Sequence, residues 1–142
     1  MPYRICKSFE IENGHMLSLR EGGCRFPHGH SRRVEVVFVA EELDDAGMVC
    51  DFTLVKRTVR DYIETFDHAL CMNTRDPMFA TLKSAYGERI IAFADTEPTT
   101  EILARTFFDT IKKMFEHLAP RVRLERVRVW ETSSSWAEFE EM

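Results

Sequence analysis

Apolar and polar residues alternate over two segments near the start of the chain, which is the pattern of β-strands with one buried face. The first segment covers about residues 2–12, and the second runs from about Ser31 to Ala40 and is rich in valine. Period-two alternation predicts a half-buried strand, and β-branched residues favour the extended backbone. Residues 18–27 contain two adjacent glycines and a proline, so they are predicted to form a loop between the two strands.

Farther along the chain, apolar side chains recur every three or four residues, which indicates amphipathic helices. One helix is predicted from about Phe52 to Phe66, with Asp51 as its N-cap. Another opens at Pro98–Glu101 and runs to about Leu118. These are the two main helices that the sequence predicts.

Residues 74–97, between the two helices, are predicted to be an insert in the domain. Asp76 and the proline after it are suited to open a short helix, which Gly87 would end. Residues 89–93 have the pattern of a short strand. An insert of this length could serve as a lid, an interface or a pocket wall.

The end of the chain returns to the alternating pattern of strands. Val127 and Val129 alternate with arginines, and Ser133–Ser135 separate them from a last strand over about residues 136–140. A change of parity upstream predicts a bulge or a late strand start near Glu125. The order of elements predicts an α+β fold, in which a four-stranded antiparallel sheet carries two main helices on one face.

Composition narrows the class of protein. The 142 residues predict one domain, residues 1–142, that is large enough for a buried core. The net charge of −5 and the lack of a basic cluster argue against nucleic acid as a partner. No apolar run reaches the ~18 residues of a membrane span, and no signal peptide is evident. The four scattered cysteines then predict reduced thiols in a cytoplasmic protein.

The residues best suited to bind a metal or to transfer a proton lie in residues 24–30, with the sequence C-R-F-P-H-G-H, together with His15 upstream. Three imidazoles that share one ion leave its fourth position open, as in catalytic zinc sites. In an extended strand, His28 and His30 point the same way, while Gly29 faces away and allows a close approach of the backbone. Cys24 adds an acid–base group beside this candidate site. Taken alone, an H-G-H triplet is equally compatible with two surface histidines on a turn.

Four segments, taken together, resemble one family. They are His15 with Cys24 and His28-Gly29-His30, then Gly47–Phe52, then Phe66–Leu70, and finally Pro98–Glu101 with Val129–Thr132. In this order the chain resembles the family of 6-pyruvoyl-tetrahydropterin and 6-carboxy-tetrahydropterin synthases. The resemblance extends from about Phe9 to Ala137, and the set of motifs is specific although each piece alone is weak.

The resemblance implies a role for each matching residue. His15, His28 and His30 would bind Zn²⁺, and Cys24 would accept a proton from the substrate. Asp67 and His68 would form a charge-relay pair that raises the basicity of the thiol. Glu131 would anchor the pterin ring and would also join the catalytic group. The family's segment that lines the pterin pocket corresponds to Thr99, Thr100 and Glu101.

Some of these residues also have simpler interpretations. Asp67 and His68 could be solvated residues at the end of a helix. Glu131 has the parity of the apolar residues before it in its strand, so it is expected to face inward, where a carboxylate without a partner is costly. Arginines 25, 32 and 33 could meet a triphosphate, although basic residues on a strand edge are more often solvated.

The resemblance also implies an activity, an assembly and a substrate. The family has the tunnelling fold, in which three subunits close their sheets into a barrel and two trimers stack into a homohexamer with active sites between subunits. The substrate would be 7,8-dihydroneopterin triphosphate. The short loop between His15 and Cys24 favours the branch that forms 6-carboxy-5,6,7,8-tetrahydropterin and serves queuosine-type deazapurine synthesis. The chain departs from the family pattern F-x-A-A before the first histidine, since Ile11-Glu12-Asn13-Gly14 stands there.

Three alternatives remain open at this point. The first is the pyruvoyl synthase, which eliminates triphosphate and rearranges the side chain. The second is a zinc hydrolase that uses a metal-bound water and leaves Cys24 without a role. The third is an oligomer that binds a pterin or a purine without catalysis and keeps zinc for structure.

Overall fold

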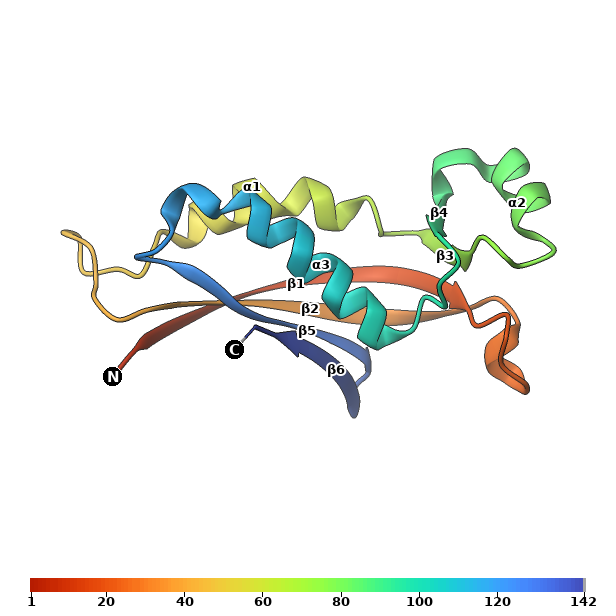
Figure 1. The fold of residues 1–142 in the computed structure, drawn as a ribbon, viewed down its shortest axis with the longest axis horizontal. Helices are drawn as coiled ribbons and strands as arrows, with labels where there is room; N and C mark the ends of the chain where they lie inside the picture. The colour runs from red at the N-terminus through yellow and green to blue at the C-terminus, as the bar shows by residue number, and fades with distance from the viewer. Residues whose placement is uncertain (142) are drawn as a thin grey trace.

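A six-stranded sheet forms the centre of the molecule in the computed structural model, which describes residues 1–141 (Figure 1). The strand order is β4-β3-β1-β2-β5-β6. The strands are β1 (Tyr3–Met16), β2 (His28–Ala40), β3 (Ala69–Asn73), β4 (Ile90–Phe93), β5 (Arg123–Thr132) and β6 (Ser135–Glu140). Strands β1, β2, β5 and β6 correspond to the four strands of the predicted sheet, and neighbouring strands among them pair antiparallel as expected.

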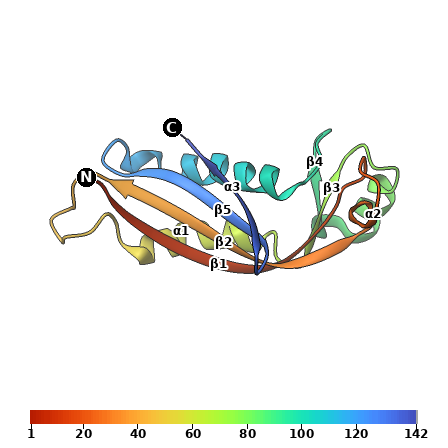
Figure 2. The same ribbon diagram turned by 90° about the horizontal axis from the view of Figure 1, so that it is seen from below.

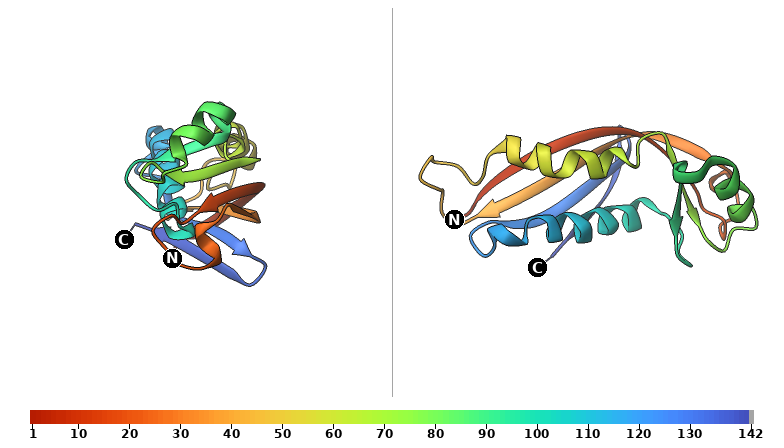
Figure 3. Two further views of the ribbon diagram at one scale, coloured as in Figure 1. Left: turned by 90° about the vertical axis from the view of Figure 1, so that its right-hand side faces the viewer. Right: turned by 90° about the horizontal axis from the view of Figure 1, so that it is seen from above.

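Two long helices cover one face of this sheet (Figures 2 and 3). Helix α1 (Phe52–Glu64) packs on β1, and helix α3 (Thr100–Met114) packs on β5 and β6. Their buried faces and the inward side chains of the strands form the main core. The fully buried centre of that core includes Val34, Val36, Val55, Val59, Ile63, Phe107 and Ile111.

The opposite face of the main sheet is free of helices and carries mostly polar side chains. Along β1 this face presents Arg4, Ser8 and Glu10, and along β2 it presents Arg33 and Glu35, because the side chains alternate. Val37 and Val39 also lie on this face and are buried, but the main hydrophobic core lies on the helix-covered side.

Two features of the fold differ from the sequence prediction. The sheet has six strands and is mixed, because β3 pairs parallel with the end of β1 and β4 pairs parallel with β3. Strand β3 was not predicted: only five residues long and nearly buried, it shows no alternation. Strand β1 is also longer than predicted, so that His15 lies within it rather than beyond its end.

Several local predictions are confirmed. The Asp51 side chain caps α1 by accepting from Thr53 N, as predicted. Helix α3 starts within the predicted Pro98–Glu101 segment, and the structure adds that the Thr99 hydroxyl caps it by accepting from Ile102 N. The register between β2 and β5 shifts beside Glu125, where the bulge was expected. A short helix, α2 (Phe79–Tyr86), ends at Gly87, as predicted. Helix α3 ends at Met114, and a separate 3-10 turn follows it.

The loop between β1 and β2 is tied to the segment that contains α2 and β4. Ser18 Oγ donates a hydrogen bond to an Asp76 carboxylate oxygen. The backbone N–H of Leu19 faces the Glu97 carboxylate, which also accepts from Asn73 Nδ2 at 2.9 Å. Residues 74–97 thus support the loop that carries the C-R-F-P-H-G-H run.

None of the helices in residues 1–141 is both long enough and apolar enough to cross a membrane.

The core predicts a large effect on stability at Phe107, which is fully buried and packs edge-to-face against Phe66. Replacing Phe107 with alanine should lower the free energy of unfolding by about 3–5 kcal/mol, because it removes apolar contacts and leaves a cavity. Urea denaturation followed by circular dichroism measures this change. Tyr86→Ala, at an exposed position, is the control and should change the free energy by less than about 0.5 kcal/mol. Equal losses in both variants would contradict this placement of the core.

Candidate metal centre

Three histidines converge on the helix-covered face at one end of the β1–β2 pair. His15 lies opposite His28 in the antiparallel register, and His30 lies opposite Asn13, two residues before His15. Alternation along both strands therefore turns all three rings to the same face. Nε2 of His15 lies 3.2 Å from Nε2 of His30, and the three potential ligand atoms all lie within 4.8 Å of one another. The interpretation as two surface histidines on a turn is wrong for this chain.

Backbone carbonyls fix the orientation of two of these rings. Nδ1 of His15 donates to the carbonyl of Pro98 at 2.8 Å, and Nδ1 of His28 donates to the carbonyl of Phe26 at 2.8 Å. With the proton on Nδ1, the lone pair of each ring lies on Nε2. Metal-binding histidines are commonly oriented in this way by their second ring nitrogen.

Burial favours the neutral, metal-binding form of His15 and His30. The pKa of His15 is lowered from 6.5 to about 4, first by burial and then by the positive charge of Arg32, while the hydrogen bond to Pro98 opposes the shift. The pKa of His30 is also lowered, first by burial and then by Arg32, while Glu131 opposes the shift. Three imidazole nitrogens within 4.8 Å of one another fit a divalent transition metal such as zinc.

Neighbouring strands pack too closely at Gly14 for a side chain, whereas at Gly29 they do not. A Cβ at Gly14 would lie 3.2 Å from both the His28 carbonyl oxygen and a methyl group of Leu70, which is tighter than ordinary contact. At Gly29 the same atom would lie 3.5 Å from its nearest neighbour, so the expectation of a close approach there is wrong. The crowding at Gly14 arises because β1 has strands on both sides at this point.

Glu131 lies beside the histidine cluster, on the inward face of β5, as its parity predicted. Its Oε1 atom is 3.6 Å from Nε2 of His15 and 3.5 Å from Nε2 of His30. The same oxygen accepts a hydrogen bond from the Thr100 hydroxyl at 3.0 Å. The structure therefore brings this carboxylate and the start of α3 to the metal cluster.

A surface depression of ≈ 320 Å³ adjoins Glu131. Its lining includes Thr100, Glu101 and Trp136, so two of the three residues of the predicted pocket segment contribute to it. The third, Thr99, uses its hydroxyl to cap α3. A carboxylate at the floor of such a depression can accept two parallel hydrogen bonds from a ligand.

Asp67 and His68 are hydrogen-bonded to each other near the start of β3. Nδ1 of His68 donates to Asp67 Oδ2 at 2.9 Å, and Asp67 Oδ1 accepts from the backbone N–H of Glu12 at 2.7 Å. The backbone hydrogen bond and then His68 lower the pKa of Asp67 below its ordinary value. Both residues follow the end of α1, so they do not belong to a helix end, and the imidazole is exposed to solvent.

Cys24 lies in the 3-10 turn of residues 23–25 and is exposed. Its backbone carbonyl accepts from the N–H of Leu17 at 2.8 Å, which closes the loop between the first two strands. Within residues 1–141, its thiol does not belong to the metal cluster and has no hydrogen bond to His68. One chain alone thus groups the histidines with Glu131 and Thr100, but leaves Cys24 and the Asp67–His68 pair apart from them.

Arg32 and Asn13 belong to the site and were not predicted as parts of it. Arg32 is only 1 % exposed, so its expected role as a solvated residue or a triphosphate contact is wrong. Its Nε donates to Asn13 Oδ1 at 3.1 Å, and its Nη1 donates to Thr100 Oγ1 at 3.1 Å. The alternation of side chains along β2 could have identified Arg32 as an inward-facing residue, because it lies two residues after His30 and two before the buried Val34.

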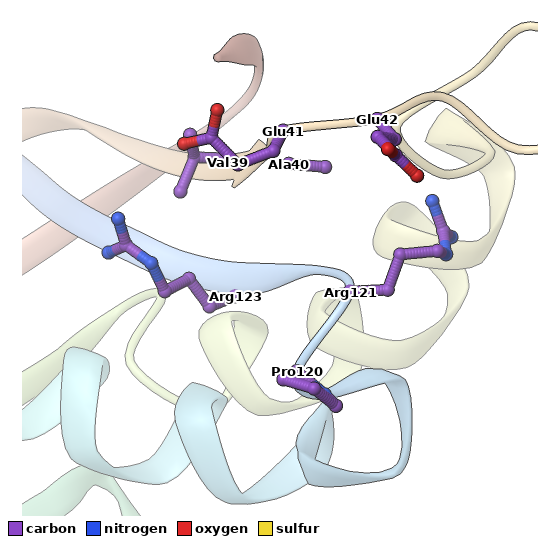
Figure 4. A pocket seen from close by; sticks show the side chains of 7 residues that line it. All are labelled: Val39, Ala40, Glu41, Glu42, Pro120, Arg121 and Arg123. Atoms are coloured by element: carbon purple, nitrogen blue, oxygen red, sulfur yellow. The ribbon is translucent and has the colours of Figure 1, made fainter. Parts of the chain in front are cut away.

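A separate cavity of ≈ 220 Å³ lies at the other end of the main sheet (Figure 4). It lies between the end of β2 and the start of β5, and two arginines and two glutamates line it together with Val39, Ala40 and Pro120. None of the candidate site residues contributes to it. The functional site is therefore placed at the histidine end.

Comparisons of this chain with a family model and with known sequences agree on one family. A family model described as 6-pyruvoyl tetrahydropterin synthase matches residues 4–142. The chain is 35 % identical over 161 aligned positions to the 6-carboxy-5,6,7,8-tetrahydropterin synthase of Aquifex aeolicus, with 99 % of each chain covered. It is 25 % identical to the enzyme of the same name from Bacillus subtilis, with 96 % of this chain and 84 % of that one covered.

Solved structures share the fold. An uncharacterised protein from Wolinella succinogenes superposes with a TM-score of 0.84 at 23 % identity, covering 100 % of this chain and 99 % of that one. The 6-pyruvoyl tetrahydropterin synthase of Plasmodium vivax superposes with a TM-score of 0.77 at 14 % identity, covering 99 % and 98 %. At these identities the likeness shows the fold alone.

The cluster predicts one metal ion for each chain. Purified protein dialysed against zinc should retain about one equivalent, as measured by elemental analysis. His30→Ala should weaken zinc binding by on the order of a hundredfold, because even an altered outer contact of a metal ligand costs ten- to a hundredfold. His117→Ala, which removes an exposed histidine outside the cluster, is the control. Equal zinc retention in both variants would exclude this metal site.

The lowered pKa of His15 predicts how the metal-free protein responds to pH. In the unfolded chain His15 takes up a proton near pH 6.5, but in the folded chain it does so only near pH 4. The unfolded state therefore binds more protons between these values, and stability must fall as the pH falls through that range. The contribution is about 3 kcal/mol, and it should be missing in His15→Asn. Urea titrations of both apoproteins from pH 7 to pH 4 test this, and parallel curves would refute it.

Proposed function

Because the chain belongs to the 6-pyruvoyl tetrahydropterin synthase family, we propose that it converts 7,8-dihydroneopterin triphosphate and water into 6-carboxy-5,6,7,8-tetrahydropterin, acetaldehyde and triphosphate. The observation that carries the proposal is full-length similarity, at 35 % identity, to a synthase that is named for this product. The histidine cluster beside a carboxylate-floored depression supports it independently. The product would serve queuosine-type deazapurine synthesis.

We assign zinc to His15, His28 and His30. When bound, zinc supplies a Lewis acid that stabilises negative charge on the side-chain oxygens of the substrate. The protein's own contribution is to hold the three imidazole rings close together, with backbone carbonyls fixing two of them. A pterin bound in the depression beside Glu131 would be near this centre, because Glu131 Oε1 is 3.5 Å from Nε2 of His30.

Glu131 is the proposed anchor of the pterin ring. A pterin presents adjacent N–H donors along one edge, and a carboxylate accepts two such bonds side by side. The hydrogen bond from Thr100 holds one carboxylate oxygen in place, and Glu101 borders the same depression. Thr99 would contribute through the cap that fixes the start of α3.

Cys24 is the proposed proton acceptor, and the Asp67–His68 pair is proposed to raise its basicity. A thiol is a useful base when a cation or an imidazole lowers its pKa from about 8.5. Asp67 is docked on β1 by the backbone of Glu12, so it can orient the His68 ring. The thiol takes a carbon-bound proton from the substrate side chain, and retro-aldol cleavage then separates the two-carbon fragment.

An assembly of several chains would complete this site. Cys24 and His68 are exposed in one chain and are not bonded to each other, which is the arrangement expected of groups that meet across an interface. On its side away from β2, β1 is paired with β3 along residues 13–16, so the preceding part of β1 has an open edge in the described chain, as does β6. We propose that these edges join in a trimeric barrel and that two trimers stack into a hexamer.

Zinc-loaded protein incubated with 7,8-dihydroneopterin triphosphate should release 6-carboxy-tetrahydropterin and acetaldehyde, as identified by mass spectrometry. The 6-pyruvoyl product would contradict the proposed branch while preserving the role of the metal site. Unchanged substrate in the presence of tight pterin binding would favour a binding protein without catalysis.

The cysteine arm of the same experiment tests the proposed base. Cys24→Ala should lower kcat by about 10²–10⁴, which is the usual contribution of general base catalysis, and should leave zinc content unchanged. Cys6→Ala removes another exposed cysteine, on the helix-free face, and is the matched control. Full activity of Cys24→Ala would point instead to hydrolysis by a metal-bound water.

A further inference from the structure

The buried guanidinium of Arg32 lies beside the metal cluster, and the proposed metal binding and proton transfer make no direct use of it. Arg32 is 1 % exposed, and its two hydrogen-bond partners are the uncharged side chains of Asn13 and Thr100. Taking a cation out of water costs several kcal/mol, and replacing a buried charge with a well-packed apolar residue is often neutral or stabilising. Stability alone therefore gives no reason for an arginine here.

One hydrogen bond of Arg32 leads through Thr100 to Glu131. Arginine has only donors, so the Thr100 hydroxyl must accept the bond from Nη1, whose length is 3.1 Å. The single proton of that hydroxyl is then free for the carboxylate, and it is donated to Glu131 Oε1 at 3.0 Å. Arg32 thus decides which way the hydroxyl points. Without it, the hydroxyl could rotate or accept a bond from water.

The other side of Arg32 is fixed by a second directional contact. Asn13 Nδ2 donates to the backbone carbonyl of Phe66 at 2.9 Å and to that of Ala69 at 3.4 Å, which leaves its Oδ1 to accept from Arg32 Nε. The amide is held by backbone on two sides and is 3 % exposed. An unbroken path of oriented bonds therefore runs from the end of α1 through Asn13, Arg32 and Thr100 to Glu131.

The contact of Arg32 with His15 is weaker than this path. Nη2 lies 3.4 Å from His15 Nδ1, but Nδ1 already donates to Pro98 at 2.8 Å and has no lone pair to offer. The guanidinium is thus placed to act on Glu131 rather than on the ring. The negative charge of Glu131 in turn stabilises the buried cation.

We infer that Arg32 is a positioning residue for ligand recognition, and that with Asn13 and Thr100 it holds the Glu131 carboxylate in the orientation that accepts the two N–H donors of a pterin. The inference rests on the proposed function, because it takes Glu131 as the pterin anchor. It goes further in assigning roles to two residues, Arg32 and Asn13, outside the metal and proton-transfer groups. It also accounts for the departure at Asn13 from the pattern F-x-A-A.

Binding of 7,8-dihydroneopterin to the zinc-loaded protein, followed by fluorescence titration, tests the inference. Arg32→Met should raise Kd at least tenfold, a loss typical for a hydrogen bond to a charged group. Thr100→Val should do the same, while Thr100→Ser, which keeps the hydroxyl, should restore binding to within about threefold. Combining Arg32→Met with Thr100→Val should cost no more than either change alone, because both break the same path. Zinc content should stay at one equivalent in every variant.

Controls separate this inference from the function on which it rests. Arg33→Met removes the neighbouring exposed arginine on the other face of β2 and should leave Kd unchanged. Weak binding by Glu131→Gln with normal binding by Arg32→Met and Thr100→Val would overturn the inference and leave the anchor role intact. Normal binding by Glu131→Gln would overturn the anchor role, and the inference with it.

The inference can still be tested if one of the variants does not fold. If Arg32→Met does not fold, the matched pair Thr100→Val and Thr100→Ser decides the outcome alone, since the two differ in the hydroxyl that carries the path. Equal Kd values for that pair would refute the inference. Additive losses in the double variant would refute it as well, because they would show two independent contributions rather than one path.

Discussion

The antiparallel pairing of β1 with β2 is the constraint on which the rest of the site depends. It sets His15 opposite His28 and Asn13 opposite His30, so that one face of two neighbouring strands carries every group of the metal cluster. A slip of one residue in this register would turn the whole set toward the helix-free face. The apolar residues farther along the same strands, which must face the helices, hold the register and so place the metal ligands.

The start of α3 completes what the strand pair begins. The carbonyl of Pro98 orients His15, and the hydroxyl of Thr100 joins Arg32 to Glu131. The cap at Thr99 fixes this end of the helix, while the buried face of α3 anchors it on β5 and β6. Core packing on one side of the sheet and a polar network at its end are therefore parts of one structure. The network satisfies its buried polar side chains within residues 1–141.

Much of this could be predicted from particular residues. Alternation predicted the four antiparallel strands, Asp51 caps the helix where a cap was expected, and the parity of Glu131 placed it inward. Strand β3 could not be predicted in the same way, because a short strand buried on both faces has no period to detect. The buried position of Arg32 followed from parity as well, but a charged residue type argued for solvent, and only its partners show why it lies inside.

By itself, the sequence determined the periodicity of each element and the side of each strand on which a given residue lies, because these follow from local backbone geometry. It also determined the types of ligand atom available, namely imidazoles, a thiol and carboxylates. Only the tertiary structure decided which of these groups meet. The His15 ring, the Thr100 hydroxyl and Glu131 come from segments far apart in the chain, and Cys24 stays outside their cluster. Such meetings depend on how the strands and helices pack against one another, and no local pattern encodes that.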